Sequence, residues 1–506
     1  MRTKKFIYNT ISSAITQFIT LIIGLILPRL FISTYGSEAN GLISSVTQFV
    51  SYFALLEAGL AASLVYSLYK PIANNDFEEI NSIVSTGKKY YNKIAALYFL
   101  LVIVLSVIYP FIAKRETIDI TTTILLVLVV GASGAINFST MAKFRVLLSA
   151  DQKTYIIALV NVVTIIINFI IVFILIKLKI NFVVVKFASL FPYFLRSIFL
   201  NLYIKKYYKK VKYNLPVNKI YLNKRFDALI VQIANTLNLS IPIVLITIIC
   251  SLKEVSVFAV YNMVFAGIVG LLSIVTSGLS ASFGDIITKN ETSILKKSYR
   301  EYEFVLYLTI SILYACSMIL IMPFIALYTK GINDINYSNL LYGILFCVWG
   351  VAFSAKLPHG TIIVAAGIFK ETRRVNILQI VLLTVLTTSL GLLFKVVGIL
   401  IGMSIASLYR SIDFMFVTEK YVKNSTAKSS IIRLLITVFA IIVSVSPFFT
   451  IISLKINSLF QFFITGFIVF IWCSAVALII NVIFYKKDLL LVLSHLKSLK
   501  RKVYLK

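Results

Sequence analysis

The sequence predicts an all-α polytopic membrane protein with about 14 transmembrane helices, and three observations support this prediction. The 506 residues are 59% hydrophobic and have a mean hydropathy of +0.96. Only 13% of them are charged, whereas a soluble domain carries about a quarter. The apolar residues form continuous runs of about 18 or more, long enough to cross about 30 Å of hydrocarbon as helices. A β-barrel would instead alternate apolar and polar residues.

These runs place the expected helices in order along the chain. The first follows the basic stretch 1–5 and exceeds the apolar core of a cleavable signal peptide, so we expect it to stay in the mature protein. We expect membrane helices near residues 9–33, 40–69, 92–113, 119–142, 155–176, 182–204, 227–251, 255–284, 304–328, 338–368, 375–394, 397–418, 431–453 and 459–485. The connections between them are short, so we expect no soluble domain on either face.

Lysine and arginine are distributed very unequally between alternate connections. The two termini and the connections 70–93, 143–153, 205–225, 289–300, 370–374 and 420–433 carry 36 of them, and the connections between carry 8. The positive-inside rule assigns the richer face to the cytoplasm, so both termini are expected there. This asymmetry explains most of the net charge of +30. The charge therefore gives no reason to expect a nucleic-acid partner.

The chain also resembles itself at an offset of about 216 residues. Ser37-Glu38 corresponds to Lys253-Glu254, and Pro28 has a counterpart in Pro242. The repeat unit contains six helices, and an even number keeps the two halves in the same orientation, related by a pseudo-two-fold axis along the membrane normal. We expect lobes at 1–204 and 227–420, a basic cytoplasmic linker at 205–226, two appended helices at 421–485 and a basic cytoplasmic tail at 486–506.

Five basic residues fall inside the expected helices: Arg29, Lys186, Arg196, Lys356 and Arg410. A cation at the bilayer centre costs about 2.5–3.5 kcal/mol on insertion scales, so we expect these side chains to face a cavity or a partner. Arg29 and Lys186 lie near the outer ends of their helices, where snorkelling to the interface is the alternative. A positively charged interior suits an anionic cargo such as a phosphate, which arginine can bind bidentately.

Three other polar residues could couple transport or pair with these cations. Glu57 and Asp413 are the two acids expected within the membrane, and His359 follows Pro358 in the tenth helix. Pairing with a cation is the expected role of Glu57, and an ion pair with Arg410, one turn away, is the alternative for Asp413. His359 is expected to be a packed, hydrogen-bonded histidine, with contact to cargo as the alternative.

No catalytic constellation is present in the sequence. GxSxG, Walker A and HExxH patterns are absent, and the four cysteines, at 250, 316, 347 and 473, form no CxxC pair. We therefore expect a transporter and no enzyme, metal or cofactor.

Five stretches carry a family resemblance: Pro28–Gly41, Leu55–Leu60, Asn235–Asn238, Lys253–Met263 and Pro358–Thr372. Together they resemble the polysaccharide (O-antigen type) flippases of the multidrug/oligosaccharidyl-lipid/polysaccharide exporter superfamily, over helices 1–12. The resemblance implies a fold of 6+6+2 helices in the bacterial cytoplasmic membrane. It implies an undecaprenyl-pyrophosphate-linked oligosaccharide as cargo, moved from the cytoplasmic to the outer leaflet. Arg29 matches, by helix and surroundings, the basic residue that holds the pyrophosphate in related lipid flippases. No acid follows Arg29, which argues against lipid II as cargo.

The mechanism that we expect is alternating access, with the headgroup held by Arg29 and some of the other four cations while the polyprenyl tail stays in lipid. Expected partners are membrane lipids, the lipid-linked sugar, a polysaccharide polymerase and other assembly proteins. A cation-coupled multidrug exporter of the same superfamily is an alternative, but it would need buried carboxylates and the first helix has none. A membrane-bound polymerase or ligase would need a large outer loop, and an assembly scaffold would leave the buried cations unexplained.

Overall fold

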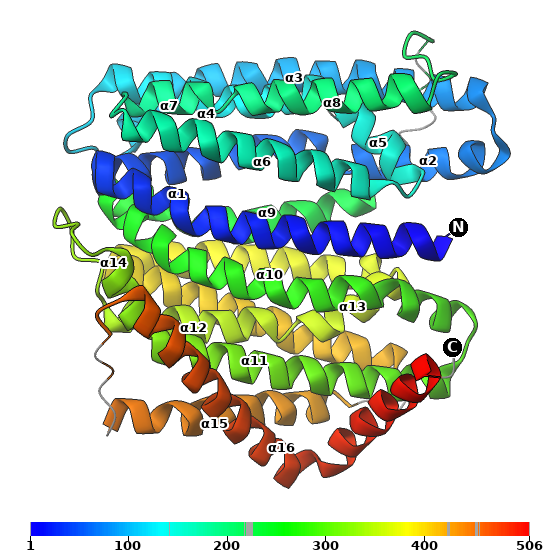
Figure 1. The fold of residues 1–506 in the computed structure, drawn as a ribbon, viewed down its shortest axis with the longest axis vertical. Helices are drawn as coiled ribbons and strands as arrows, with labels where there is room; N and C mark the ends of the chain where they lie inside the picture. The colour runs from blue at the N-terminus through cyan, green and yellow to red at the C-terminus, as the bar shows by residue number, and fades with distance from the viewer. Residues whose placement is uncertain are drawn as a thin grey trace. The chain divides into compact units, whose positions relative to one another are not determined.

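The computed structural model describes residues 2–140, 142–216, 218, 226–422, 426–450, 454 and 456–504, and within these ranges every element is a helix (Figure 1). Side chains are described in the same ranges except at residues 2–7, 226–231, 234, 235, 274, 275, 277, 278, 280, 281, 369, 370, 450 and 495–504. In the described part, 11 segments are long and apolar enough to cross a membrane. Two of these, Tyr8–Asn74 and Glu371–Tyr421, are long enough for two crossings each, and Thr236–Ile249 adds a shorter apolar helix. The prediction of about 14 transmembrane helices is therefore confirmed.

The helices form two compact units, which are described separately. The first contains Met1–Val260 and Gly331–Ile335. Its elements are α1 (Arg2–Phe53), the short 3-10 helix η1 (Ala54–Glu57), α2 (Leu60–Asn74), α3 (Phe77–Ile112), α4 (Ile120–Thr140), α5 (Ala142–Ala150), α6 (Thr154–Lys177), α7 (Phe182–Ala188), α8 (Phe191–Tyr207), α9 (Phe226–Ile249) and the start of α10 (Leu252–Thr288). Helix α3 packs along α4, and α1 packs against both α6 and α9 (Figure 1).

The second unit contains Tyr261–Lys330 and Asn336–Lys506. After the rest of α10, its elements are α11 (Thr292–Tyr328), α12 (Leu340–Ser354), α13 (Leu357–Ala366), α14 (Phe369–Tyr421), α15 (Ala427–Thr450) and α16 (Leu459–Tyr504). Helix α11 packs against α12, α15 and α16, and α12 lies along α14. The long α1 and α14 each contain one residue with non-helical dihedral angles, Gly36 and Lys395, at the places where the sequence predicts a connection between two helices.

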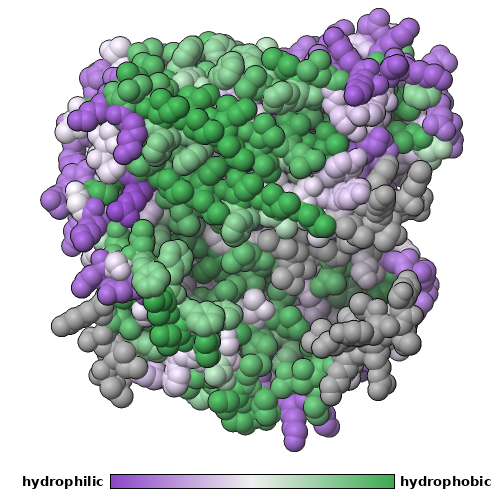
Figure 2. Space-filling model, viewed as in Figure 1, coloured by the Kyte–Doolittle hydropathy of each residue, from purple (hydrophilic) through white to green (hydrophobic). Residues whose placement is uncertain are grey.

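Apolar side chains cover the outer faces of the helices. In the first unit, the visible face over α6 and α8 is hydrophobic along its middle, and hydrophilic residues gather at the helix ends (Figure 2). Phe99 and Phe111 of α3 and Phe194 of α8 are between 40% and 80% exposed. Large apolar groups on an outer surface are the pattern of helices that contact lipid.

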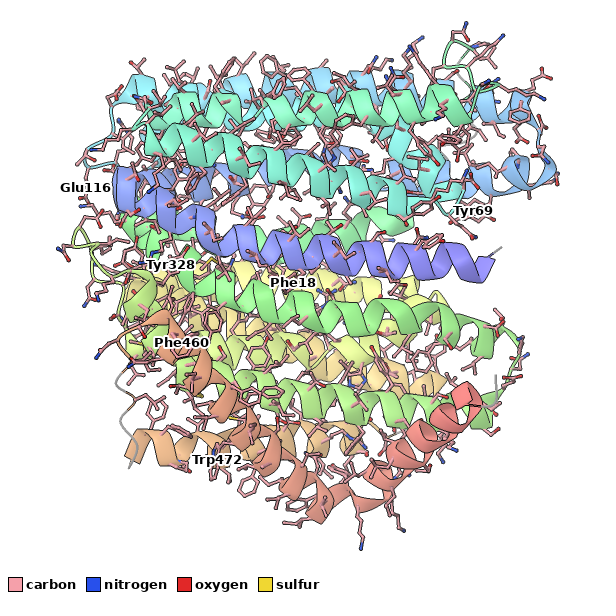
Figure 3. All side chains as sticks on the ribbon, viewed as in Figure 1. Phe18, Tyr69, Glu116, Tyr328, Phe460 and Trp472 are labelled. Atoms are coloured by element: carbon pink, nitrogen blue, oxygen red, sulfur yellow. The ribbon has the colours of Figure 1, made fainter. Side chains whose placement is uncertain are left out.

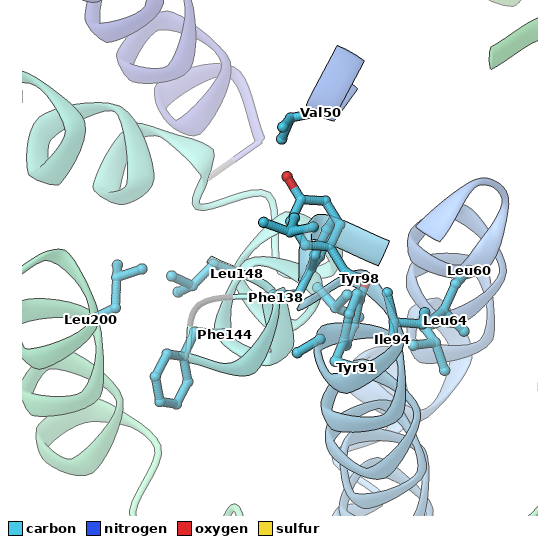
Figure 4. Packing of buried hydrophobic residues seen from close by; sticks show 14 of the residues in the cluster. Val50, Leu60, Leu64, Tyr91, Ile94, Tyr98, Phe138, Phe144, Leu148 and Leu200 are labelled. Atoms are coloured by element: carbon cyan, nitrogen blue, oxygen red, sulfur yellow. The ribbon is translucent and has the colours of Figure 1, made fainter. Parts of the chain in front are cut away.

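Aromatic side chains fill the core of the first unit. Tyr91 and Tyr98 of α3 pack with Leu60 and Leu64 of α2 and with Phe138 of α4 (Figure 4). The Tyr98 and Phe138 ring centroids are 5.4 Å apart in an edge-on arrangement, a geometry that aromatic quadrupoles favour.

The internal repeat is visible in the backbone and in the packing. Non-glycine residues with positive φ in the first half recur about 216 residues later: Asn75 (56°) at Asn290 (55°) and Lys179 (54°) at Lys395 (53°). Each half also contains a tyrosine packed on a glycine of the next helix. A Cβ atom on Gly134 would lie 2.1 Å from the Tyr98 hydroxyl oxygen, and one on Gly350 would lie 2.2 Å from Cε1 of Tyr314. The six-helix repeat predicted from weak sequence matches is thus present as a structural duplication.

Three helices predicted as continuous are broken, which corrects those boundaries. The segment 40–69 is interrupted at Gly59, whose φ of 78° suits glycine. The segment 182–204 is divided into α7 and α8 before Pro192, and 338–368 is divided into α12 and α13 before Pro358. Proline lacks an N–H and is favoured in the first turn of a helix, so each proline starts a new helix. The predicted lobe, linker and tail boundaries remain predictions.

The described part of the basic linker packs on α3. Asn81 donates to the Lys210 carbonyl over 3.2 Å and accepts from the Lys212 amide over 2.7 Å, and Ser85 accepts from the Leu215 amide over 3.0 Å. Residues 219–225 of the linker lie outside the described residues.

Close packing of α3 on α4 leads to a first prediction. A Cβ on Gly131 would lie 2.2 Å from Cγ1 of Val102, so Gly131→Ala should lower the stability of the protein by about 1–3 kcal/mol through overpacking. Thermal unfolding of the detergent-solubilised protein measures the effect. Gly24→Ala is the control, because nothing lies within 4 Å of a Cβ there.

A second substitution tests the cause of that loss. Val102→Ala removes both methyl groups that the new Cβ would meet, so the double variant should recover part of the stability. If Gly131→Ala unfolds at the same temperature as Gly24→Ala, the close packing of α3 on α4 is not a constraint.

Candidate functional site: buried charges within the helices

Two of the predicted cations lie in the first unit near the same aromatic ring. Arg29 is half-buried on α1, directly after Pro28. Lys186, on α7, places its Nζ 4.7 Å from the ring centroid of Phe31, two residues beyond Arg29. Phe31 belongs to a small apolar cluster in which α1 packs against Val172 and Val185. This packing brings the start of the sixth predicted helix next to the residues that follow Pro28 in the first predicted helix.

Arg196 lies at a polar cavity in the first unit. The cavity has a volume of about 100 Å³ and its polar lining comes from Thr164 and Asn168 of α6, Ser189, and Tyr193 and Arg196 of α8. The Nε of Arg196 and the Oδ1 of Asn168 are buried and make no hydrogen bond within the described structure. Buried polar atoms of this kind usually bind water or a ligand.

Glu57 is paired with a cation, as its sequence context suggests. It is 9% exposed on η1 and forms an ion pair with Arg145 of α5, while the hydroxyl of Tyr91 donates to its Oε1 over 3.0 Å. Arg145 is also close enough to Arg196 for the two positive charges to repel each other. The region around Glu57 therefore contains one carboxylate and two guanidinium groups. Burial also lowers the pKa of Lys143 on α5, and the positive charge of Lys88 lowers that pKa further.

Lys356 and Arg410 are the most deeply buried of the predicted cations and lie in the second unit. Lys356 is 9% exposed and Arg410 is 4% exposed. The Nζ of Lys356 is 3.6 Å from the ring centroid of Phe353, and the guanidinium carbon of Arg410 is 5.0 Å from that of Phe414. The two side chains are close enough for their charges to repel each other. No carboxylate of the described residues lies within ion-pair distance of Lys356.

The break between α12 and α13 brings these two cations together. Lys356 is the residue before α13, whose first turn contains Pro358. On the neighbouring helix, the hydroxyl of Ser411 donates to the Ala352 carbonyl over 2.6 Å, and the indole of Trp349 donates to Ser407 over 3.2 Å. These contacts fix α14 beside the end of α12, so Arg410 faces the region of the break.

Asp413 does not neutralise Arg410. Asp413 is half-buried on α14, its Oδ2 is buried without a hydrogen bond, and no ion pair joins it to Arg410 in the described residues. The intrahelical pair considered from the sequence is therefore absent.

His359 is a packed, hydrogen-bonded histidine. It is fully buried on α13, its Nδ1 lies 2.8 Å from the Tyr299 hydroxyl, and its Nε2 lies 3.4 Å from the Tyr307 hydroxyl. Tyr307 also donates to the Ala355 carbonyl over 3.1 Å. The histidine thus connects α13 to α11 beside the break that carries Lys356.

A buried ionic cluster beside His359 was missed by sequence reasoning. Glu303 of α11 accepts from Ser430 over 2.5 Å and lies 3.8 Å from Nε of Arg433 on α15. Arg433 contacts Asp488 of α16 over 2.8 Å, and Arg300 approaches the same carboxylate at 2.5 Å. The buried acids of the described residues therefore include Glu303 and Asp488 as well as Glu57. Helices α11 and α15 begin before the predicted 304 and 431, and α16 runs beyond 485, so these charges lie on helices and not on connections.

The first unit also contains polar contacts between residues of the two sequence repeats. Asn40 donates to Ser256 over 2.8 Å, and these residues are 216 positions apart, which makes them equivalent in the repeat. Equivalent residues meet each other only near a two-fold axis. Ser45 shares a 2.6 Å hydrogen bond with Thr247, and a Cβ on Gly41 would overlap the Leu252 carbonyl oxygen, at 1.7 Å. We call these contacts the seam.

Further contacts close the same end of the first unit. The backbone amide and hydroxyl of Ser37 both donate to Asp334, each over 2.7 Å. Lys253 forms an ion pair of 2.6 Å with Glu116, a residue that follows α3 (Figure 3). By the charge asymmetry of the sequence, this end is expected to be extracytoplasmic.

The structure thus brings Lys356 near Arg410, and Arg196 near the pair of Glu57 and Arg145. Arg29 and Lys186 lie near Phe31. The predicted chamber between the lobes remains a prediction. Among the described residues, no group of three His, Cys, Asp or Glu side chains could hold a metal ion.

Comparison with known proteins identifies the fold. No protein-family model and no curated protein matches the sequence. A multidrug resistance MATE family transporter of the MOP superfamily matches in its inward-facing conformation with a TM-score of 0.66 and 13% identity, over 82% of this chain and 98% of that chain. An outward-facing conformation of such a transporter matches with a TM-score of 0.62 and 13% identity, over 83% and 95%.

A MOP superfamily transporter from Pyrococcus furiosus, whose binding pocket is described as having reverse polarity that suggests a different function, matches with a TM-score of 0.59. Its identity to this chain is 14%, over 83% of this chain and 95% of that chain. At these identities the likeness establishes the fold alone. The predicted superfamily fold, with two lobes, is confirmed at this level.

The ionic cluster leads to a second prediction. Asp488 is 1% exposed, so Asp488→Asn would leave Arg433 buried without its closest countercharge. Breaking a buried pair costs about 3–5 kcal/mol, and the melting temperature of the purified protein should fall by several degrees. Asp285→Asn is the matched control, because it removes the exposed ion pair with Lys289, which is worth about 0.2–1 kcal/mol. Equal melting temperatures of the two variants would show that the cluster does not support the fold.

Proposed function

We propose that this protein is a flippase that moves an undecaprenyl-pyrophosphate-linked oligosaccharide from the cytoplasmic to the outer leaflet of a bacterial cytoplasmic membrane by alternating access. In this proposal the anionic headgroup binds to cations within the helices, and the polyprenyl tail remains in lipid. The observation that carries the proposal is the pair formed by Lys356 and Arg410. Both are almost fully buried, and they lie close enough to repel each other.

Two like charges at membrane depth are costly unless an anion comes between them. Each costs about 2.5–3.5 kcal/mol at the bilayer centre on insertion scales, and the described residues place no carboxylate next to Lys356. A pyrophosphate would remove this penalty, because charge-assisted hydrogen bonds to an anion are about twice as strong as neutral ones. The site would therefore bind an anion more tightly than a neutral or cationic molecule.

The first unit offers a second cationic region. Arg196 lines a cavity together with Asn168 and Tyr193, and its Nε is buried without a hydrogen bond. The cavity of about 100 Å³ has room for a few water molecules, which suits a wet site more than a dry core. Arg29 and Lys186 are further candidates for the headgroup, because both lie near Phe31, where α1 packs on α7.

The fold supports alternating access. Solved transporters with this fold are described in inward-facing and outward-facing conformations. One of them is described by a binding pocket of reverse polarity and a different function. We infer that the sign of the charge at the binding site distinguishes functions within this fold, and the candidate site formed by Lys356 and Arg410 is positive.

Export of drugs is the second candidate function, because two of the similar structures are multidrug resistance transporters. An exporter of organic cations would need carboxylates that face the cargo. Three of the buried acids described here are instead engaged with arginines, Glu57 with Arg145 and both Glu303 and Asp488 with Arg433. A fourth, Glu38, accepts hydrogen bonds from Glu116 and Thr117. Asp413 is the exception, and its unpartnered Oδ2 is the group that a cation exporter would use.

Removal of the paired cations is the third prediction. Lys356→Met combined with Arg410→Met should slow the flipping of a lipid-linked oligosaccharide in proteoliposomes by roughly tenfold or more, because each charge-assisted hydrogen bond is worth about 1.5–3 kcal/mol. The assay measures how quickly the labelled sugar becomes accessible to an enzyme outside the vesicle. Arg29→Ala is expected to act in the same direction.

The control is Lys289→Gln, which removes an exposed lysine and should leave the rate unchanged. Unfolding temperatures of all variants identify losses that come from misfolding. Unchanged flipping by the folded Lys356→Met/Arg410→Met variant would contradict the role of the pair. If organic cations are exported and Asp413→Asn abolishes that export, multidrug transport replaces the proposal.

Locking the seam is the fourth prediction. The hydroxyl oxygens of Ser45 and Thr247 are each bonded directly to a Cβ atom and are 2.6 Å apart, so cysteines at both positions should form a disulfide on oxidation and hold the seam closed. Transport should stop and return after reduction. The single variants Ser45→Cys and Thr247→Cys, which retain the native cysteines, should transport equally before and after oxidation. Full transport by a quantitatively cross-linked protein would show that the seam does not open during the cycle.

A further inference from the structure

The last helix bends where it leaves the membrane. Helix α16 starts at Leu459 and continues to Tyr504, but Tyr485 has non-helical dihedral angles (φ −132°, ψ 37°). The part before the bend is long enough to cross about 30 Å of hydrocarbon, at 1.5 Å per residue. The chain after Tyr485 turns away from the axis of the first part (red in Figure 1). The bend thus lies at a membrane interface, which the charge asymmetry of the sequence assigns to the cytoplasmic side.

Asp488 fixes the first turn after the bend. Its carboxylate is 2.8 Å from Arg433 of α15 and 2.5 Å from Arg300 of α11. The Arg433 guanidinium also lies over the ring of Tyr485, 4.7 Å from its centroid. Helices α11 and α15 therefore hold this turn of α16 through charged contacts, and the direction of the segment that follows depends on these contacts.

The opposite side of this segment presents leucines without a cover. Leu490 is 55% exposed and Leu493 is 45% exposed. They are three residues apart, so they share one side of the helix, whereas Asp488 points to the bundle. Lys486 and Lys487 are exposed beside them.

The charged residues of this segment are basic, apart from one acid. The sequence from 486 onward contains Lys486, Lys487, Lys497, Lys500, Arg501, Lys502 and Lys506, and its single acid is Asp488. Asp488 is buried against two arginines, so it does not offset the lysines at the surface. A helix that combines exposed leucines with a basic sequence, whose one acid is buried, at a membrane edge has the chemistry of an interfacial helix.

We propose that residues 486–504 form an interfacial helix that binds the headgroups of anionic phospholipids. The leucines enter the boundary between headgroups and acyl chains, and the basic residues contact the phosphates. The Asp488 contacts set the angle at which the helix meets the membrane. This inference concerns the surrounding lipid and holds whatever cargo the transporter carries.

Hydrogen–deuterium exchange of the full-length protein in nanodiscs tests the proposal. One set of nanodiscs contains phosphatidylcholine alone, and the other contains phosphatidylglycerol as well. Backbone amides of residues 489–502 should exchange roughly tenfold more slowly in the anionic nanodiscs, because each basic residue near a charged surface adds to the attraction. Lys497→Gln/Lys500→Gln/Arg501→Gln/Lys502→Gln should remove the difference.

A matched control removes four charges elsewhere. Lys205→Gln/Lys206→Gln/Lys209→Gln/Lys210→Gln should keep the slower exchange of residues 489–502. A second variant, Leu490→Gln/Leu493→Gln, should reduce the protection in both nanodiscs while leaving the melting temperature unchanged. Equal exchange of the wild-type segment in the two nanodiscs would overturn the proposal. So would an equal loss of protection in the control variant. No cargo is present, so neither outcome bears on the flippase proposal.

Discussion

A charged group buried among helices must find a counterion, an aromatic face or water, because apolar side chains supply none of these. The second unit contains two different solutions to this problem. Glu303, Arg433, Asp488 and Arg300 neutralise one another across α11, α15 and α16. Lys356 lies over the ring of Phe353 and Arg410 over the ring of Phe414, and no carboxylate of the described residues lies within ion-pair distance of Lys356. The first arrangement supports the fold, and the second is where we place the proposed anion-binding role.

Duplication explains how the chain builds these sites from one plan. Equivalent turns recur at Lys179 and Lys395, and equivalent tyrosine–glycine contacts recur at Tyr98 and Tyr314. The two halves nevertheless differ in the chemistry of their buried cations. Arg145 of the first half forms an ion pair with Glu57, whereas Lys356 of the second half directly precedes α13 and has no carboxylate of the described residues within ion-pair distance.

The number of helices and the repeat could be predicted from the sequence, because apolar length and periodic charge are local signals. The ionic cluster could not. Glu303, Arg433 and Asp488 each lie within two turns of a basic connection, and a sequence does not show that helices continue through such a region. The sequence shows Gly59 and Pro358, but a glycine or proline within a membrane helix does not by itself predict that the helix is interrupted there. Proximity of Lys356 to Arg410 depends on the packing of α12 against α14, which sequence spacing alone does not determine.

The seam of Asn40 with Ser256 and Ser45 with Thr247 consists of neutral hydroxyl and amide groups. Each such hydrogen bond has a net worth of only about 0.5–1.5 kcal/mol, because water can replace either partner. Parting this surface would therefore require an amount of energy that differential binding of a single ligand can supply. The ion pair of Lys253 with Glu116 at the same end is partly exposed, and an exposed ion pair adds only about 0.2–1 kcal/mol to this cost. In the proposed transport cycle, weak and exchangeable contacts near the repeat axis therefore let the binding of a ligand shift the balance between two states.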